Sequence, residues 1–159
     1  MSHPIPPDFA DESLYASDAW FIHRLIGVDK PNRKVIGEMD TTRIGWLVDH
    51  QREVAGHAKH VPAAVVIQAT GTLGQLYAVY ALDLRPTQGW AGYGTHIRQA
   101  RFLRMGLIGP PLVCTLTATK QRQLLGTWFC DFTFRFEQRG EVVYESTQSA
   151  AWRKLADAP

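Results

Sequence analysis

The stretch VPAAVVIQATGTLGQLYAVYALDL, residues 61–84, carries no charge until Asp83, near its end. We expect it to form one long helix, because Pro62 suits a first helical position, where its missing N–H would have no partner anyway. Apolar side chains occur on all sides of this helix, as is typical of a helix buried in a core. Polar residues within it argue against a lipid-facing span, so the sequence favours a soluble protein without a membrane partner.

Small residues form one stripe on this helix. Gly71 and Gly74 lie between Ile67 and Ala78, at spacings of three or four that share a helix face. A glycine inside a helix costs about 1 kcal/mol relative to alanine. The stripe therefore predicts close contact between the helix backbone and a flat neighbour such as a sheet.

A second stripe is polar and consists of Gln68, Thr72 and Gln75. Buried polar groups normally find partners within the protein. These side chains therefore either bond one another or the buried backbone, or they face a cavity that holds a polar ligand. The sequence leaves both interpretations open.

Strand-like runs precede and follow the helix. Residues 20–28 and 34–39 are predicted to pair as a hairpin, because Asp29-Lys30-Pro31-Asn32 between them has the composition of a turn. Residues 127–137 alternate between apolar and polar side chains, and a period of two indicates one buried and one solvated face. The strands expected after the helix are residues 91–105, 111–121, 127–137 and 141–153.

The remaining segments carry weaker signals. Residues 1–15 are rich in proline and are expected to be an irregular arm. Residues 41–59 are expected to be mostly loop, with a possible helical turn. A length of 159 residues predicts a single domain spanning 1–159. An antiparallel sheet with one wide apolar face needs a cover, and the only long helix available is 61–84. The predicted fold class is therefore α+β, with the sheet wrapped around this helix in the hot-dog arrangement.

Composition excludes several classes of function. The net charge is +2, and the basic residues are scattered apart from Arg98, Arg101 and Arg104, which argues against nucleic-acid binding. Cys114 and Cys130 lie within predicted strands and lack metal-ligand spacing. No signal peptide is visible at the start, so we expect a reduced, cytoplasmic protein.

Three stretches resemble the hot-dog superfamily, in particular the bacterial 3-hydroxyacyl-carrier-protein dehydratases. WFIHRLIGVDKPNRKVIGEM (20–39) is similar to their opening hairpin. GHAKHVPAAVVIQATGTLGQ (56–75) resembles their active-site loop and central helix, and IRQARFLRMGLIGPP (97–111) resembles the strand and turn that follow. The resemblance implies an acyl thioester substrate on acyl carrier protein or coenzyme A, and no cofactor. It also implies a homodimer, or a dimer of dimers, whose sheets join edge to edge and whose active sites lie at the subunit interface.

Residue by residue, the resemblance places the dehydratase histidine on His57, with His60 as a competing match. The helix carboxylate of those enzymes falls on Gln68, whose amide cannot act as a general acid. The N–H groups near Ala63 and Ala64 are expected to polarise the thioester carbonyl.

The same region also resembles actinobacterial long-chain acyl-CoA thioesterases of this fold, in which Gln68 or Thr72 would hold a water. Gln75 is expected to contribute to the substrate cavity. Asp49 is either an orienting carboxylate for a histidine or a plain surface residue. Histidine and carboxylate suit zinc or iron, but no established metal-ligand spacing is present, so no metal site is predicted. Dehydration is the favoured interpretation, with thioester hydrolysis and acyl-thioester binding without catalysis as alternatives.

Overall fold

The long helix occupies the centre of the computed structural model, which describes residues 3–155. This helix, α3, runs from Ala63 to Leu82, and Pro62 occupies its N-cap. It ends where Asp83 adopts a left-handed conformation, and the N–H of Leu84 donates to the carbonyl of Ala78. The prediction of a helix within 61–84 is therefore confirmed. Length and composition alone would allow α3 to cross a membrane, but 61% of its most apolar window is buried inside the fold.

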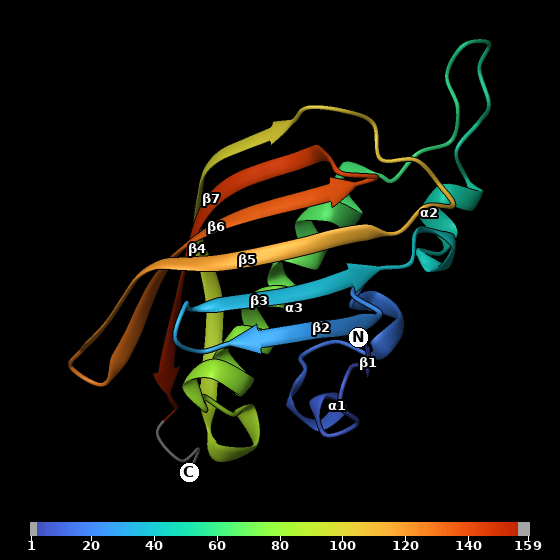
Figure 1. The fold of residues 1–159 in the computed structure, drawn as a ribbon. Coiled ribbons are helices and arrows are strands. Elements are labelled where there is room, and N and C mark those ends of the chain that lie inside the picture. The colour runs from blue at the N-terminus through green and yellow to red at the C-terminus, as the bar shows by residue number, and fades with distance from the viewer. Residues whose placement is uncertain (1–2, 156–159) are drawn as a thin grey trace.

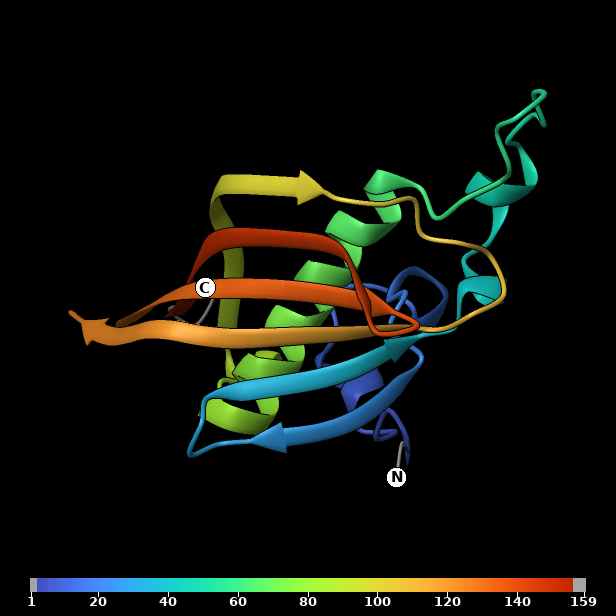
Figure 2. The same ribbon diagram turned by 45° about the horizontal axis from the view of Figure 1, so that its top comes forward.

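A seven-stranded antiparallel sheet curves around α3 (Figures 1 and 2). The strand order is β1-β2-β3-β5-β6-β7-β4. The strands are β1 (His3–Pro4), β2 (Arg24–Asp29), β3 (Lys34–Met39), β4 (Trp90–Phe102), β5 (Leu112–Leu124), β6 (Thr127–Gln138) and β7 (Glu141–Lys154). Two short helices, α1 (Phe9–Glu12) and α2 (Trp46–Asp49), and 3₁₀ turns at Ser17–Ala19, Thr41–Arg43 and Pro86–Gln88 complete the described elements.

The prediction of one buried face for residues 127–137 is confirmed. Phe132, Phe134 and Phe136 of β6 are buried, as are Leu112 and Leu116 of the neighbouring β5. These side chains point toward α3, whose Leu73, Leu76 and Tyr77 are buried in the same core. Because most of the inward-facing side chains of β5 and β6 are apolar, burying them against α3 contributes strongly to stability.

The opening strand begins later than the sequence suggested. Residues 20–28 were predicted to be strand, but β2 covers only Arg24–Asp29. Phe21 has a φ of 57°, a left-handed conformation that interrupts an extended chain. The indole N–H of Trp20 donates to the hydroxyl of Ser13 and the carbonyl of Tyr15. Trp20 thus ties the N-terminal segment to the core instead of extending the sheet.

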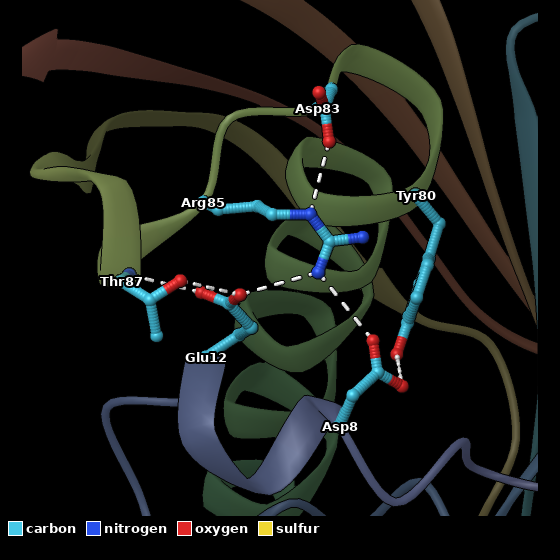
Figure 3. A network of polar contacts seen from close by, with 6 residues as sticks. All are labelled: Asp8, Glu12, Tyr80, Asp83, Arg85 and Thr87. Atoms are coloured by element: carbon cyan, nitrogen blue, oxygen red, sulfur yellow. Dashed lines mark hydrogen bonds and ion pairs between the residues drawn. The ribbon is translucent and has the colours of Figure 1, made fainter.

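The expectation of an irregular arm over residues 1–15 is also wrong for its described part. Phe9 is fully buried and packs edge-on against Trp20, with ring centroids 5.0 Å apart. Arg85 lies among the carboxylates of Asp8, Glu12 and Asp83, and the hydroxyl of Tyr80 donates to Asp8 (Figure 3). Glu12 also accepts from the N–H and the hydroxyl of Thr87. A buried aromatic and a polar network therefore hold the first helix against the end of α3.

The glycine stripe does not contact the sheet. A Cβ added at Gly71 or at Gly74 would meet nothing within 4 Å, and Gly71 is exposed. The prediction that this stripe faces the sheet is therefore wrong. Gly74 and Ala78 of the stripe are buried, but the large core side chains of α3, which include Val65, Leu73 and Leu76, lie on the opposite face.

Candidate functional site

Unpaired backbone donors lie at the start of α3. The carbonyl of Pro62 accepts from the N–H groups of Val65 and Val66. Among residues 3–155, no acceptor is present for the N–H groups of Ala63 and Ala64, and both residues are exposed. Such a helix start favours a partial negative charge, because free N–H groups and the helix dipole point to it.

Gln68 lies one turn along the helix from these donors. It shares a face with Ala64, since residues four apart are aligned and side chains lean toward the helix N-terminus. The side chain is half-buried, and no hydrogen bond is made to it by any residue in 3–155. Its amide is therefore free to bind a group near the helix start.

The other two members of the polar stripe are already engaged. The hydroxyl of Thr72 is buried and donates to the carbonyl of Trp20 at 2.8 Å. Gln75 accepts from the hydroxyl of Ser13 at 3.1 Å. Both residues therefore hold the N-terminal segment against α3. Of the three residues in the polar stripe, Gln68 is therefore the one whose side chain makes no hydrogen bond within residues 3–155.

His57 and His60 lie in the segment that joins α2 to α3, which projects well beyond the body of the molecule (Figures 1 and 2). The two rings stack edge to face, with centroids 5.1 Å apart. His60 is anchored, because its N–H and carbonyl both bond the side chain of Gln51. His57 is exposed and closes a tight turn by donating its N–H to the carbonyl of Val54. His57 is therefore exposed in this segment, whereas His60 is half-buried and its backbone bridges to Leu107.

Asp49 is not joined to these histidines by any contact in the described part of the chain. It is exposed and lines a shallow cavity of about 310 Å³ together with Arg43 and Gly45. Helix α3 contains neither aspartate nor glutamate. Within residues 3–155, no group of three or more histidine, cysteine or acidic side chains is arranged to hold a metal ion. Within one chain, the chemistry available near Gln68 thus comes from its amide and from the backbone N–H groups of Ala63 and Ala64.

β4 is an edge strand of the sheet. Within residues 3–155, β4 pairs only with β7, and every residue from Tyr93 to Phe102 is exposed. The exposed side chains include Tyr93 (59%), Ile97 (51%) and Phe102 (48%).

On the facing side of α3, Ala63, Ala64, Ile67 and Gly71 are also exposed. We call these helix residues, together with Ile97 and Phe102, the open face. The strand pattern predicted β4 itself, but alternation does not reveal which strand lies at a sheet edge.

Comparison with known proteins identifies the fold. No family model matches the chain, and no curated protein matches it in sequence. Among solved structures, a variant thioesterase from Pseudomonas aeruginosa matches with a TM-score of 0.60 and 15% identity, over 93% of this chain and 91% of that one. A dehydratase heterocomplex from Xenorhabdus doucetiae matches with a TM-score of 0.65 and 16% identity, over 98% and 94%. A thioesterase from Haemophilus influenzae matches with a TM-score of 0.59 and 16% identity, over 94% and 89%. The fold is therefore the predicted hot-dog fold, which these proteins share.

Proposed function

We propose that the protein acts on an acyl thioester, carried by coenzyme A or acyl carrier protein, and that it hydrolyses the thioester bond. The observation that carries this proposal is Gln68, an unengaged amide one turn from the free N–H groups of Ala63 and Ala64. An amide binds and orients water but does not exchange protons at neutral pH. This constellation favours hydrolysis over dehydration, which needs a proton donor for the departing hydroxyl.

In the proposed reaction, the start of α3, Gln68 and a histidine have different roles. The thioester carbonyl oxygen accepts hydrogen bonds from the start of α3, which stabilises the negative charge that develops on it. Gln68 holds a water against the carbonyl carbon, and His57 or His60 accepts the proton as the water oxygen attacks. The carbon–sulfur bond then breaks, and the imidazolium returns the proton to the thiolate. The products are a carboxylic acid and a free thiol.

We further propose that two copies form the site together. An unpaired strand as long as β4 invites pairing with another chain, and its exposed side chains include Tyr93, Ile97 and Phe102. Antiparallel pairing of β4 with β4 of a second copy gives a closed two-fold dimer. In such a dimer the outward-projecting His57 of one copy is proposed to approach Gln68 of the other. The side chain of Thr72, engaged with Trp20, holds the N-terminal segment in place.

The dimer proposal has a direct test. Ile97→Lys places a charge in the proposed interface, and we expect analytical ultracentrifugation to show monomers of this variant and dimers of the wild type. Leu124→Lys is the control, since Leu124 is similarly exposed (57%) but lies at the far end of β5. If Ile97→Lys remains dimeric while Leu124→Lys does not, the interface lies elsewhere.

Complementation between inactive variants tests the composite site. Gln68→Ala and His57→Ala should each lose hydrolytic activity, whereas His50→Ala and Gln123→Ala, at exposed positions, should retain it. Mixing the two inactive variants under conditions of subunit exchange should restore about a quarter of wild-type activity, because half of the dimers gain one intact site. No recovery, despite demonstrated exchange, would contradict a shared site. Loss of activity in His60→Ala but not in His57→Ala would move the proton acceptor to His60.

Dehydration of a 3-hydroxyacyl thioester is the second candidate. It is favoured by the sequence pattern in which Gly56-His57 precedes Pro62 and an apolar helix. In this case the protein would form an enoyl thioester without releasing thiol.

A further inference from the structure

The hairpin formed by β5 and β6 projects beyond the rest of the sheet (Figures 1 and 2). The pairing of β3 with β5 ends at Thr117, whereas β5 and β6 remain paired as far as Leu124 and Thr127. At the tip, Leu124 is 57% exposed and Leu125 is 96% exposed. Single exposed leucines are common, but two adjacent ones at the end of a projecting hairpin indicate contact with an apolar environment.

The backbone conformation of Leu125 is also unfavourable for a leucine. Leu125 and Gly126 have φ values of 49° and 76°, the pattern of a type I′ turn, which prefers asparagine, aspartate or glycine at its first position. Arg139 and Gly140 form the same pattern, at 53° and 79°, between β6 and β7, but the side chain of Arg139 is charged and exposed. Leucine thus occupies a position at which neither its backbone nor its contact with water favours it.

Positive charge lies directly behind the two leucines. Lys120 and Arg122 are exposed on β5, and no acidic residue occurs between positions 118 and 130. Asp131 lies opposite Lys120, but its carboxylate already accepts from Arg98 and Ser149. The hairpin therefore combines an apolar tip with a cationic stem.

The spacing of these groups matches a membrane surface. Because a strand rises by about 3.4 Å per residue, Arg122 lies about 10 Å behind Leu125. Segments that lie in a membrane interface bury their apolar side chains about 5–10 Å into the boundary between headgroups and acyl chains. With the leucines at that depth, Arg122 reaches the lipid phosphates. Lys30 and Arg33 add positive charge from the neighbouring turn between β2 and β3, where the carbonyl of Arg33 accepts from the N–H of Ala118.

We propose that this hairpin tip docks the protein on an anionic phospholipid membrane. The two leucines insert among the acyl chains, and Lys120 and Arg122 bind the headgroup phosphates, because cations near an anionic membrane surface add to affinity. The tip lies at the opposite end of the strands from Phe102, so docking leaves the open face accessible. This surface contact does not require a spanning helix, which the polar residues of α3 argue against.

Co-sedimentation with sucrose-loaded vesicles tests this proposal. The vesicles contain either phosphatidylcholine alone or an equimolar mixture of phosphatidylcholine and phosphatidylserine. We expect wild-type protein to bind the mixed vesicles about tenfold more tightly, and high salt should remove this preference by screening the charges.

Two substitutions at equivalent turn positions sharpen the test. Leu125→Asn should weaken binding to the mixed vesicles about tenfold. It should not lower Tm, because asparagine suits this turn position. Arg139→Asn is the matched control, since it changes the same position of the same type of turn at the other end of β6, and it should bind vesicles as the wild type does. Arg122→Gln keeps both leucines and should reduce the preference for the mixed vesicles.

Binding of wild-type protein to neither kind of vesicle, or to both equally, would overturn the proposal. Equal binding of Leu125→Asn and wild type to the mixed vesicles would overturn it as well. If Leu125→Asn changes the oligomeric state in analytical ultracentrifugation while vesicle binding persists, the tip contacts protein and not lipid. None of these results bears on the proposed function, because the tip contributes no residue to the candidate site.

Discussion

Replacing Glu12 by glutamine tests how the N-terminal segment is fastened to α3. Glu12 is 5% exposed and accepts three hydrogen bonds, at 3.2 Å from Arg85 and at 3.0 and 2.8 Å from the N–H and hydroxyl of Thr87. Glutamine has the same shape, but it carries no charge and has an NH₂ group in place of one oxygen. With the remaining oxygen toward Arg85, the NH₂ faces the N–H of Thr87, so two donors meet (Figure 3).

The expected cost follows from these contacts. A hydrogen bond to a charged group contributes about 1.5–3 kcal/mol, and Glu12→Gln removes the charge and at least one such bond. We therefore expect the free energy of unfolding to fall by about 2 kcal/mol. For a domain of this size that corresponds to a decrease in Tm of about 4–8 °C. Asp11→Asn is the matched control, because Asp11 is an exposed neighbour, and it should leave Tm unchanged.

The effect should also depend on pH. Burial raises the pKa of Glu12, but the bonds from Thr87 and Arg85 outweigh it and hold the pKa below its ordinary value of 4.5. A carboxylate with a lowered pKa in the folded state stabilises the fold above its unfolded-state pKa, and this contribution is lost as the pH falls through the folded-state pKa. The difference in stability between wild type and Glu12→Gln should thus be full at pH 7 and shrink at acid pH. Urea titrations at both pH values measure it, and a difference that grows on acidification would refute the reasoning.

Three further substitutions probe the packing. Phe9→Ala should lower the free energy of unfolding by about 3–5 kcal/mol in urea titrations, because Phe9 is fully buried; a cost below 1 kcal/mol would show that the segment is not part of the core. Gly92→Ala should lower Tm, because the added Cβ would lie 2.1 Å from the indole nitrogen of the buried Trp152, and an unchanged Tm would contradict this contact. Gly71→Ala should raise stability by about 1 kcal/mol, since its Cβ would meet nothing within 4 Å; a loss of stability would indicate close packing there.

The sequence was sufficient for most of the fold. The alternation of Phe132, Phe134 and Phe136 with polar neighbours has a period that only a strand satisfies, and the uncharged stretch ending at Asp83 indicated a helix whose polar residues favoured a soluble core. Three features depended on tertiary contacts that no local pattern records. They are the left-handed conformation of Phe21, the burial of Phe9 and the open surroundings of Gly71.

The candidate site was less predictable than the fold. Spacing grouped Gln68, Thr72 and Gln75 correctly on one side of α3, but it did not reveal that Trp20 and Ser13 engage the last two. His57 and His60 were named from a resemblance, and spacing did not reveal that the side chain of Gln51 anchors the backbone of His60.

Product analysis with two thioesters tests the central claim most directly. The purified protein is given a saturated acyl-coenzyme A and a 3-hydroxyacyl-coenzyme A of equal chain length, and free thiol, carboxylic acid and enoyl product are quantified by mass spectrometry. The account predicts that thiol and carboxylic acid form in equal amounts, without enoyl product, and that Gln68→Ala abolishes this release. Enoyl thioester formed without release of thiol would contradict hydrolysis and establish dehydration in its place.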